Sequence, residues 1–216
     1  MINRDRFLEY FDKEKIKKKK CIQNNEGRRI IFTEKIDGEI YFIKKYIPRK
    51  QRKRSIAFGL RKDRVEHYKF ISDKLEILGI PHVKPECIII NRKSFFERES
   101  ILVTKYGGIP LGEIPDLEKK ENRKLFDKFF NYFILMCKNG IYSTDYNSGG
   151  ALVKNDELYL IDFDPYRTKW IVTKKFKEYV IYKLEKTLHI DKKNDEEFKN
   201  YLKKQVLRVR KELGWE

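Results

Sequence analysis

The sequence predicts an α+β fold of two lobes, in which a β-rich half with one helix precedes a helical half with one small hairpin. Three observations predict it. Apolar and β-branched runs fill the first half, Gly107-Gly108 interrupts the pattern, and helical periods fill the second half. A chain of 216 residues is long enough for both lobes to bury a core. We place the first lobe at 1–105, a hinge and connector at 106–115, and the second lobe at 116–216.

The first half carries the strand signals. Residues 28–47 predict a hairpin, because Asp37-Gly38 is a two-residue turn signal between two apolar arms. Side chains alternate along a strand, so Lys44 and its neighbour Lys45 face opposite sides of the second arm. Apolar residues at helical spacing predict one helix over 61–78, and two further strands are expected at 86–91 and 100–106.

The second half reads as helices around a short hairpin. We expect a long helix from Asp116, its N-cap, to the residue before Gly140. Two short apolar runs flank the turn at 154–156 and predict the hairpin. An amphipathic helix is expected over 169–189, and Asn194 with Glu197 forms a capping-box pattern for the last helix.

The charge balance points to an anionic partner. Fifty Lys and Arg oppose 33 Asp and Glu, for a formal net charge of +17. The basic clusters at 17–20 and 44–64 favour an anionic membrane surface, whereas the aromatic residues fall at core spacing rather than as base-stacking platforms for nucleic acid. The N-terminus has no apolar signal core, and the longest apolar helical run, 129–137, is too short to span a bilayer. We therefore expect a cytoplasmic protein that associates peripherally with the membrane.

Two aspartates around the small hairpin suggest the chemistry. Asp145 follows the long helix, and Asp162 ends the second strand of the hairpin seventeen residues later. Protein-kinase-like enzymes place a catalytic aspartate and the metal-binding aspartate of D-F-G in this way. Here the second element is Asp162-Phe163-Asp164, and residues 41–44 resemble the strand that carries the phosphate-binding lysine.

Each role has a physical reason. Phosphoryl transfer needs Mg²⁺ on the phosphates of ATP, a carboxylate beside the acceptor hydroxyl, and a cation on the phosphates. Asp162, Asp145 and Lys44 would supply these three. Glu66, on the next helix, would form an ion pair with the lysine. Two alternatives stay open, because Lys45 would replace Lys44 after a register change and Asp63 competes with Glu66.

More narrowly, the chain resembles the bacterial kinases that phosphorylate inner-core sugars of lipopolysaccharide, of the heptose kinase and Kdo kinase type. The segments IDGEIYFIKKYIPRK, LEILGIPHVKP and ELYLIDFDPYR carry the resemblance, which covers roughly 24–167. It implies a compact two-lobed protein-kinase-like fold that uses ATP and Mg²⁺ at the cytoplasmic face of the inner membrane. It also implies that Lys44 binds phosphates, Asp145 is the base and Asp162 binds metal.

The chain departs from this pattern at three places. Ser143 stands where the loop usually has His, Gly150 stands where it usually has Asn, and the glycine-rich loop is reduced to Gly27. Asn147 is a candidate to take over a metal contact. Only the 54 residues 163–216 follow the metal-binding aspartate, which favours a glycan or small-molecule acceptor over a regulated protein substrate.

Three functions remain in view. The first is an ATP-dependent kinase acting on a lipopolysaccharide core glycolipid. Ser143 and Gly150 suggest a pseudokinase scaffold as the second. The high positive charge suggests a small atypical, RIO-like protein kinase associated with RNA as the third.

Overall fold

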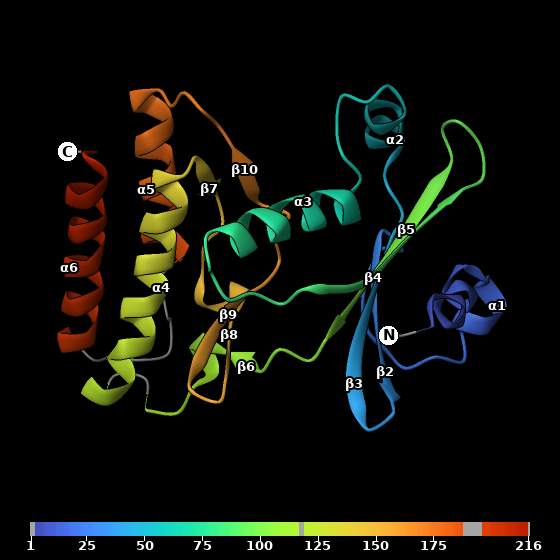
Figure 1. The fold of residues 1–216 in the computed structure, drawn as a ribbon, viewed down its shortest axis with the longest axis horizontal. Helices are drawn as coiled ribbons and strands as arrows, with labels where there is room; N and C mark the ends of the chain where they lie inside the picture. The colour runs from blue at the N-terminus through green and yellow to red at the C-terminus, as the bar shows by residue number, and fades with distance from the viewer. Residues whose placement is uncertain (1–2, 117–118, 188–195, 216) are drawn as a thin grey trace. The chain divides into compact units, whose positions relative to one another are not determined.

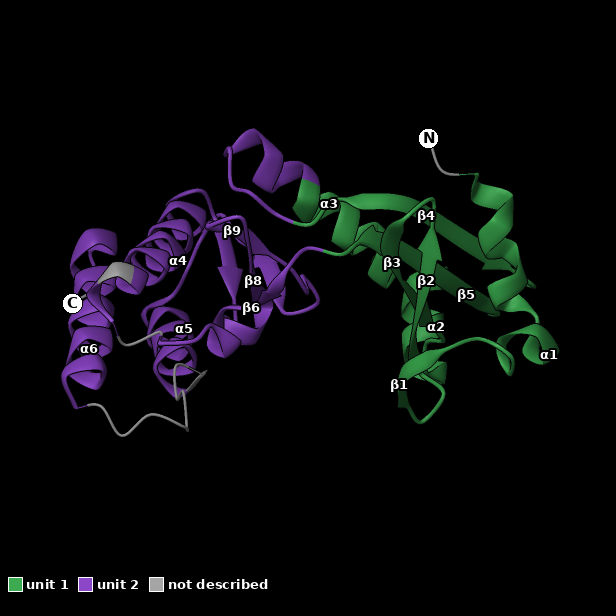
Figure 2. Ribbon diagram, turned by 90° about the horizontal axis from the view of Figure 1, so that it is seen from below, with its two compact units in different colours: residues 1–72, 83–106 green, residues 73–82, 107–216 purple. Residues whose placement is uncertain are grey.

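The computed structural model describes residues 3–116, 119–187 and 196–215, which belong to two compact units (Figure 2). Unit 1 comprises residues 1–72 and 83–106, and unit 2 comprises residues 73–82 and 107–216. Unit 1 is rich in strands and unit 2 in helices. The predicted α+β fold class is therefore confirmed.

Unit 1 is built on one antiparallel sheet in the strand order β1-β2-β3-β5-β4 (Figure 1). The predicted turn between β2 and β3 is present, since Ile36 pairs with Glu39. Asp37 and Gly38 have φ of 48° and 84°, the left-handed conformation that Asp-Gly adopts most readily in a two-residue turn. The strands are β1 (Cys21–Asn25), β2 (Arg29–Ile36), β3 (Glu39–Tyr46), β4 (Pro85–Arg92) and β5 (Arg98–Lys105).

One face of the sheet is covered by an N-terminal segment that the sequence did not predict. It consists of the 3-10 helix η1 (Arg4–Phe11) and the short helix α1 (Lys13–Ile16). Phe7 and Tyr10 are fully buried there in a cluster that also contains Ile43 of β3. Because side chains alternate along β3, Lys45 shares this covered face and Lys44 lies on the opposite one.

The start of α3 (Arg64–Ile77) lies against the other face. Asp63 accepts a hydrogen bond from the Ser100 hydroxyl at 2.6 Å, and Ser100 is the partner of Tyr46 across β3 and β5. Tyr46 and Lys44 are two residues apart on β3, so Lys44 and the N-terminus of α3 share this face. The sequence indicated the basic cluster at 44–64 only as a charged segment. Part of this cluster forms helix α2 (Lys50–Ala57).

Unit 2 packs its helices beside small sheets (Figure 1). Aromatic and polar contacts join the helices: the rings of Phe126 and Phe198 lie 5.3 Å apart, and the Tyr201 hydroxyl donates to Asp127 at 2.6 Å. The elements are α4 (Lys120–Lys138), α5 (Lys174–Thr187), α6 (Glu196–Leu213), β6 (Ile109–Pro110), β7 (Ile141–Ser143), β8 (Ala151–Lys154), β9 (Glu157–Leu160), β10 (Tyr166–Thr168), and the 3-10 turns η2 (Leu111–Glu113) and η3 (Ser148–Gly150).

Helix boundaries differ from the prediction in two places. The long helix begins at Lys120 rather than at Asp116, which has a φ of 49° and so does not have the extended geometry of an N-cap. The next helix begins at Lys174 rather than at residue 169, because Thr173 caps it: the Thr173 hydroxyl accepts a hydrogen bond from the Phe176 amide at 3.2 Å. Asn194, the predicted cap of the last helix, lies outside the described residues.

Within the described residues, no helix combines the length and the apolar character needed to cross a bilayer.

Candidate functional site

Two short strand pairs bring Asp145 and Asp162 together. β7 pairs with β10, and Ser143 lies opposite Tyr166. The start of the loop that leaves β7 therefore lies beside the end of the segment that leads into β10. Asp145 lies on the first of these segments and Asp162 on the second. The predicted proximity of the two aspartates therefore follows from the local strand pairing.

The β8–β9 hairpin fixes the other ends of the same two segments. Ala151 pairs with Leu160, and the Ile161 amide donates to the Gly150 carbonyl at 2.9 Å. Residues 144–150 and 161–165 are thus held at both ends by strand pairing. Such double attachment restricts the loop conformations, as a catalytic constellation requires.

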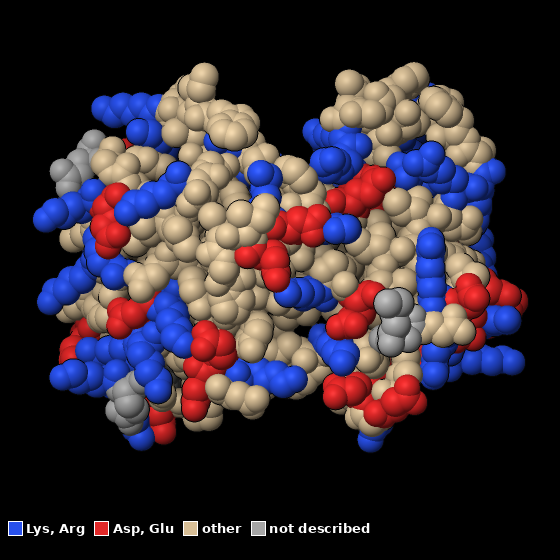
Figure 3. Space-filling model, in the orientation of Figure 1, with Lys and Arg blue, Asp and Glu red and all other residues tan. Residues whose placement is uncertain are grey.

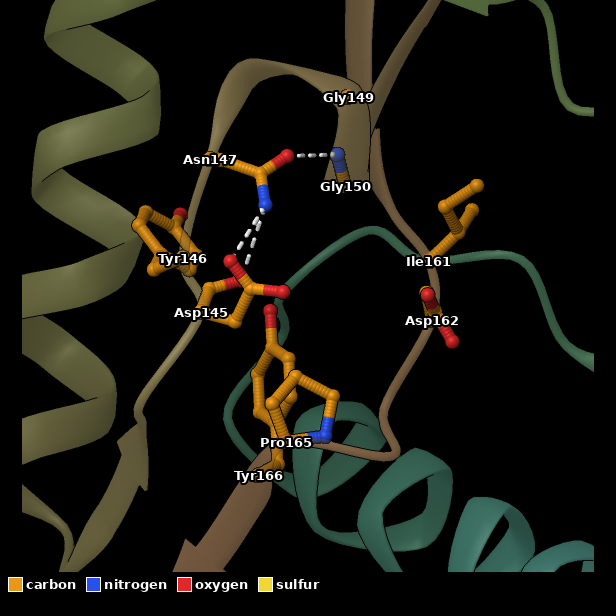
Figure 4. A pocket seen from close by; sticks show the side chains of 9 residues that line it. All are labelled: Asp145, Tyr146, Asn147, Gly149, Gly150, Ile161, Asp162, Pro165 and Tyr166. Carbon is orange, nitrogen blue, oxygen red and sulfur yellow. Dashed lines mark hydrogen bonds between the residues drawn. The ribbon is translucent and has the colours of Figure 1, made fainter. Parts of the chain in front are cut away.

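The two segments enclose a pocket of about 230 Å³ (Figure 4). The Asp145 side chain extends into it from one wall, and Asp162 lies on the facing wall. Most of the lining is polar backbone or side chain. The lining residues are Asp145, Tyr146, Asn147, Gly149, Gly150, Ile161, Asp162, Pro165 and Tyr166.

Asn147 holds the Asp145 carboxylate (Figure 4). Its amide nitrogen donates to Asp145 Oδ1 at 3.0 Å and to the Asp145 carbonyl at 3.3 Å. Its amide oxygen accepts from the Gly150 amide at 3.0 Å. That oxygen retains a second lone pair, so a metal contact by Asn147 is compatible with these bonds.

Tyr146 attaches the loop to α4. Its ring is buried and stacks on Phe129 at 4.2 Å, and its hydroxyl donates to the Phe129 carbonyl at 2.8 Å. Burial raises the pKa of Tyr146, so the phenol remains neutral and keeps this donor role. On the opposite side of the loop, the Ser143 hydroxyl accepts from the Asp145 amide at 3.2 Å.

Asp162, the candidate metal ligand on the second segment, has an unusual backbone conformation. Asp162 has a φ of 58°, a left-handed conformation that costs a non-glycine residue about 1–2 kcal/mol. The next residue, Phe163, is fully buried and packs against the rings of His82 at 6.0 Å and Tyr166 at 5.2 Å. The anchored Phe163 therefore fixes the position from which the Asp162 carboxylate projects.

Tyr166 links the two carboxylates electrostatically. Its pKa is raised, first by burial and then by the negative charges of Asp162 and Asp145, so the phenol stays protonated. Its hydroxyl points toward the Asp145 side chain (Figure 4). Both carboxylates thus act on one buried phenol at the base of the pocket.

The pocket has the donor chemistry of a magnesium site that is shared with a nucleotide. Magnesium prefers oxygen ligands and is usually held by one or two carboxylates together with substrate phosphates. Asp162, Asp145 and the Asn147 amide oxygen are donors of this type. Among the described residues no three His, Cys, Asp or Glu side chains cluster for metal binding.

The other two predicted site residues belong to unit 1. Lys44 is half-buried on β3, on the face shared with the start of α3. Glu66 Oε2 accepts from the Asp63 amide at 2.9 Å while Asp63 Oδ1 accepts from the Val65 amide at 3.1 Å, which is a capping box at the start of α3. Asp63, the alternative to Glu66, is buried in this cap. Lys45, the alternative to Lys44, is buried in an ion pair with Glu99 at 3.1 Å.

The sequence interpretation missed several residues of the pocket. Tyr146 and Tyr166 were assigned no site role, although both lie within a few residues of the two aspartates. An aromatic residue directly after a loop aspartate was the only available signal for Tyr146. Such a residue is far more often part of the core, and its ring is indeed buried against α4.

Comparison with known proteins gives a likeness of fold. No protein-family model matches the chain, and no curated protein matches it. Among solved structures, it is similar to "WaaP in complex with acyl carrier protein", with a TM-score of 0.59 and 17% sequence identity. The match covers 91% of this chain and 82% of that chain. The predicted resemblance to lipopolysaccharide core kinases is therefore confirmed at the level of the fold.

Proposed function

We propose that the protein is an ATP-dependent kinase that phosphorylates a sugar hydroxyl of the lipopolysaccharide inner core, on heptose or Kdo. The observation that carries this proposal is the pocket in which Asp145 and Asp162 face each other. It occurs on a fold shared with WaaP, itself a lipopolysaccharide core kinase. The likeness of fold to WaaP also supports a kinase-like phosphotransferase.

The geometry supports a role for each residue. Asp145 is exposed and lines the pocket, and its carboxylate would accept the proton of the sugar hydroxyl as the bond to phosphorus forms. The Asn147 amide keeps that carboxylate oriented. Asp162 would hold Mg²⁺, which when bound neutralises charge on the transferred phosphoryl group.

Lys44 would bind the phosphates from unit 1. Lys45 already has a buried partner in Glu99 and lies on the face covered by η1, so its charge is occupied in the fold. Lys44 shares its face with Phe42, whose ring lies 6.3 Å from Tyr106 in a stacked arrangement. These rings would provide an apolar surface for the adenine base. Glu66 has one carboxylate oxygen in the capping box and a second with which to pair Lys44.

Two of the three departures from the family pattern, Ser143 and Gly150, have structural roles here. Ser143 is buried and supports the Asp145 amide, and the Gly150 amide supports Asn147. These contacts favour a working catalytic loop over the pseudokinase alternative.

Calorimetric titration with ATP tests the nucleotide and metal roles. We expect wild-type protein to bind ATP more tightly with Mg²⁺ than without it, and Asp162→Asn to lose that difference. Equal affinities in the two proteins would contradict the metal role of Asp162. Tight, salt-dependent binding of RNA with no binding of lipopolysaccharide micelles would instead favour the RNA-associated kinase.

A further inference from the structure

Unit 1 exposes a cluster of three phenylalanines, Phe58, Phe95 and Phe96. Phe58 follows α2, and Phe95 and Phe96 lie at the turn between β4 and β5. Their rings lie 4.9–6.0 Å apart in edge-to-face contacts, yet Phe58 is 63% exposed and Phe95 is 67% exposed. A contiguous exposed aromatic cluster on a folded protein marks an interaction surface.

This cluster is bordered by positive charge. Residues 48–62 contain seven Lys and Arg and no Asp or Glu. Over α2 and the β4–β5 turn, Figure 3 shows uncharged side chains at the tip, Lys and Arg side chains beside and beneath them, and a group of Asp and Glu side chains lower down. Aromatic residues bordered by Lys and Arg are the usual composition of a protein surface that meets an anionic bilayer.

A pocket of about 100 Å³ adjoins the cluster. Its lining includes Phe95 together with Arg92 and Arg98, which are directly opposite each other across β4 and β5. Like charges in directly opposed positions destabilise a strand pair unless a counter-charge lies between them. Asp63 supplies a counter-charge to Arg98 from outside the pocket, and the residues that line the pocket include no carboxylate, so an anion that entered it would meet two guanidinium groups.

Arg98 forms an ion pair with the buried Asp63, yet two of its donors have no hydrogen-bond partner among the described residues. The residue is 8% exposed, and its Nε lies 3.7 Å from Asp63 Oδ2, beyond hydrogen-bond distance. Neither its Nε nor its Nη2 has a hydrogen-bond partner among the residues that the structure describes. Buried donors of a charged group are costly without partners, and a guanidinium binds the oxygens of a phosphate well.

We propose that Arg92, Arg98 and the phenylalanine cluster form a docking site for an anionic phospholipid of a bilayer. The phosphate of one headgroup would occupy the arginine pocket, and the phenylalanine rings would enter the interfacial layer beside it. A bilayer satisfies both halves of the surface at once, since it offers phosphate beside apolar chains. The inference rests on the proposed function, because a kinase that acts on a membrane glycolipid has to reach the membrane. It deepens that function by naming the surface that contacts the bilayer.

Co-sedimentation with vesicles of phosphatidylcholine and phosphatidylglycerol tests the aromatic half. We expect Phe95→Ser to weaken binding by about tenfold, because a large apolar side chain no longer leaves water. Leu207→Ser is the matched control, since Leu207 is also exposed, at 64%, but lies on α6 of unit 2. An equal loss in both variants, or no loss in Phe95→Ser, would overturn the proposal.

A second pair of variants tests the arginine half. Arg92→Ala and Lys93→Ala remove the same charge from adjacent residues, but only Arg92 lines the pocket, while Lys93 pairs with Glu99 at 2.8 Å. Loss of one nearby charge alone weakens binding about fivefold. We therefore expect a loss beyond fivefold for Arg92→Ala and at most fivefold for Lys93→Ala. Equal losses would reduce the site to general electrostatics and contradict it.

Three further results would also overturn the proposal. One is equal binding to vesicles with and without phosphatidylglycerol. Another is binding of soluble inorganic phosphate at this pocket with no vesicle binding. The third is a change of oligomeric state in Phe95→Ser, seen by sedimentation, with vesicle binding unchanged. None of these assays contains ATP or acceptor sugar, so Asp162→Asn should bind vesicles like wild type even if the proposed kinase activity fails.

Discussion

The Asn147 contacts predict how firmly the candidate catalytic loop is held. Asn147→Ala removes the donor bonds to Asp145 and the acceptor bond from the Gly150 amide. These bonds are partly solvent-exposed, so their summed net contribution is about 1–2 kcal/mol. For a chain of 216 residues that corresponds to a fall in melting temperature of about 2–8 °C.

Asn147→Asp makes the same prediction sensitive to pH. The introduced carboxylate keeps the acceptor for Gly150 but faces Asp145, and repulsion between the two raises the pKa of the introduced group in the folded state. A group with a raised folded-state pKa stabilises below its unfolded pKa and loses that contribution as pH rises through the folded value. We therefore expect Asn147→Asp to melt close to wild type in acid and well below it at pH 8.

Thermal unfolding followed by circular dichroism measures both variants. Asn131→Ala is the control. This asparagine is exposed on α4 and accepts a hydrogen bond from Arg208 of α6 at 2.8 Å, outside the candidate catalytic loop. The reasoning is refuted if Asn147→Ala melts with the control. It is also refuted if the deficit of Asn147→Asp is the same in acid and at pH 8.

Substitutions at Lys45, Lys44 and Asp162 also test the fold and the proposed site. Lys45→Met should cost about 3 kcal/mol in unfolding free energy, because it leaves the largely buried Glu99 without one partner, whereas Lys44→Met should lose ATP affinity with little change in melting temperature. Burial raises the pKa of Glu99, but hydrogen bonds from Lys93 and Lys45 hold this pKa below its ordinary value. The stabilisation is therefore lost as pH falls through the folded-state pKa. A deficit of Lys45→Met that does not shrink in acid would contradict the assignment. Asp162 has a φ of 58°, so Asp162→Gly should be at least as stable as Asp162→Ala in chemical denaturation. Gly is ordinarily less stable than Ala by about 0.5–1 kcal/mol. If Asp162→Gly is the less stable variant, no backbone strain is present at this position.

Short-range signals made much of the fold and site predictable. The turn at Asp37-Gly38 requires left-handed backbone that this dipeptide supplies, and the turn at Asn155 and Asp156 uses the same chemistry. The proximity of Asp145 and Asp162 was predictable too, because a tight hairpin between two segments returns the chain to its starting point. These features depend on neighbours in sequence.

The features that were not predicted depend on distant contacts. The apolar residues of η1 lie among charges, and the helix forms because Phe7 and Tyr10 pack on the sheet and the Tyr10 hydroxyl donates to Glu34 at 2.6 Å. Alternation along β3 showed that Lys44 and Lys45 face opposite sides. Which side is covered depended on η1, so the choice between the two lysines could not be made from the strand alone.

Phosphoryl transfer by the Asp145→Asn variant tests the central claim most directly. The substitution keeps the shape of the side chain but removes the charge and basicity that a sugar hydroxyl requires. With labelled ATP, Mg²⁺ and dephosphorylated core glycolipid, we expect transfer by wild type and a loss of about 10²–10⁴-fold in the variant, with ATP affinity and melting temperature nearly unchanged. Undiminished transfer by Asp145→Asn, or no transfer by a wild type that binds ATP normally, would contradict the account.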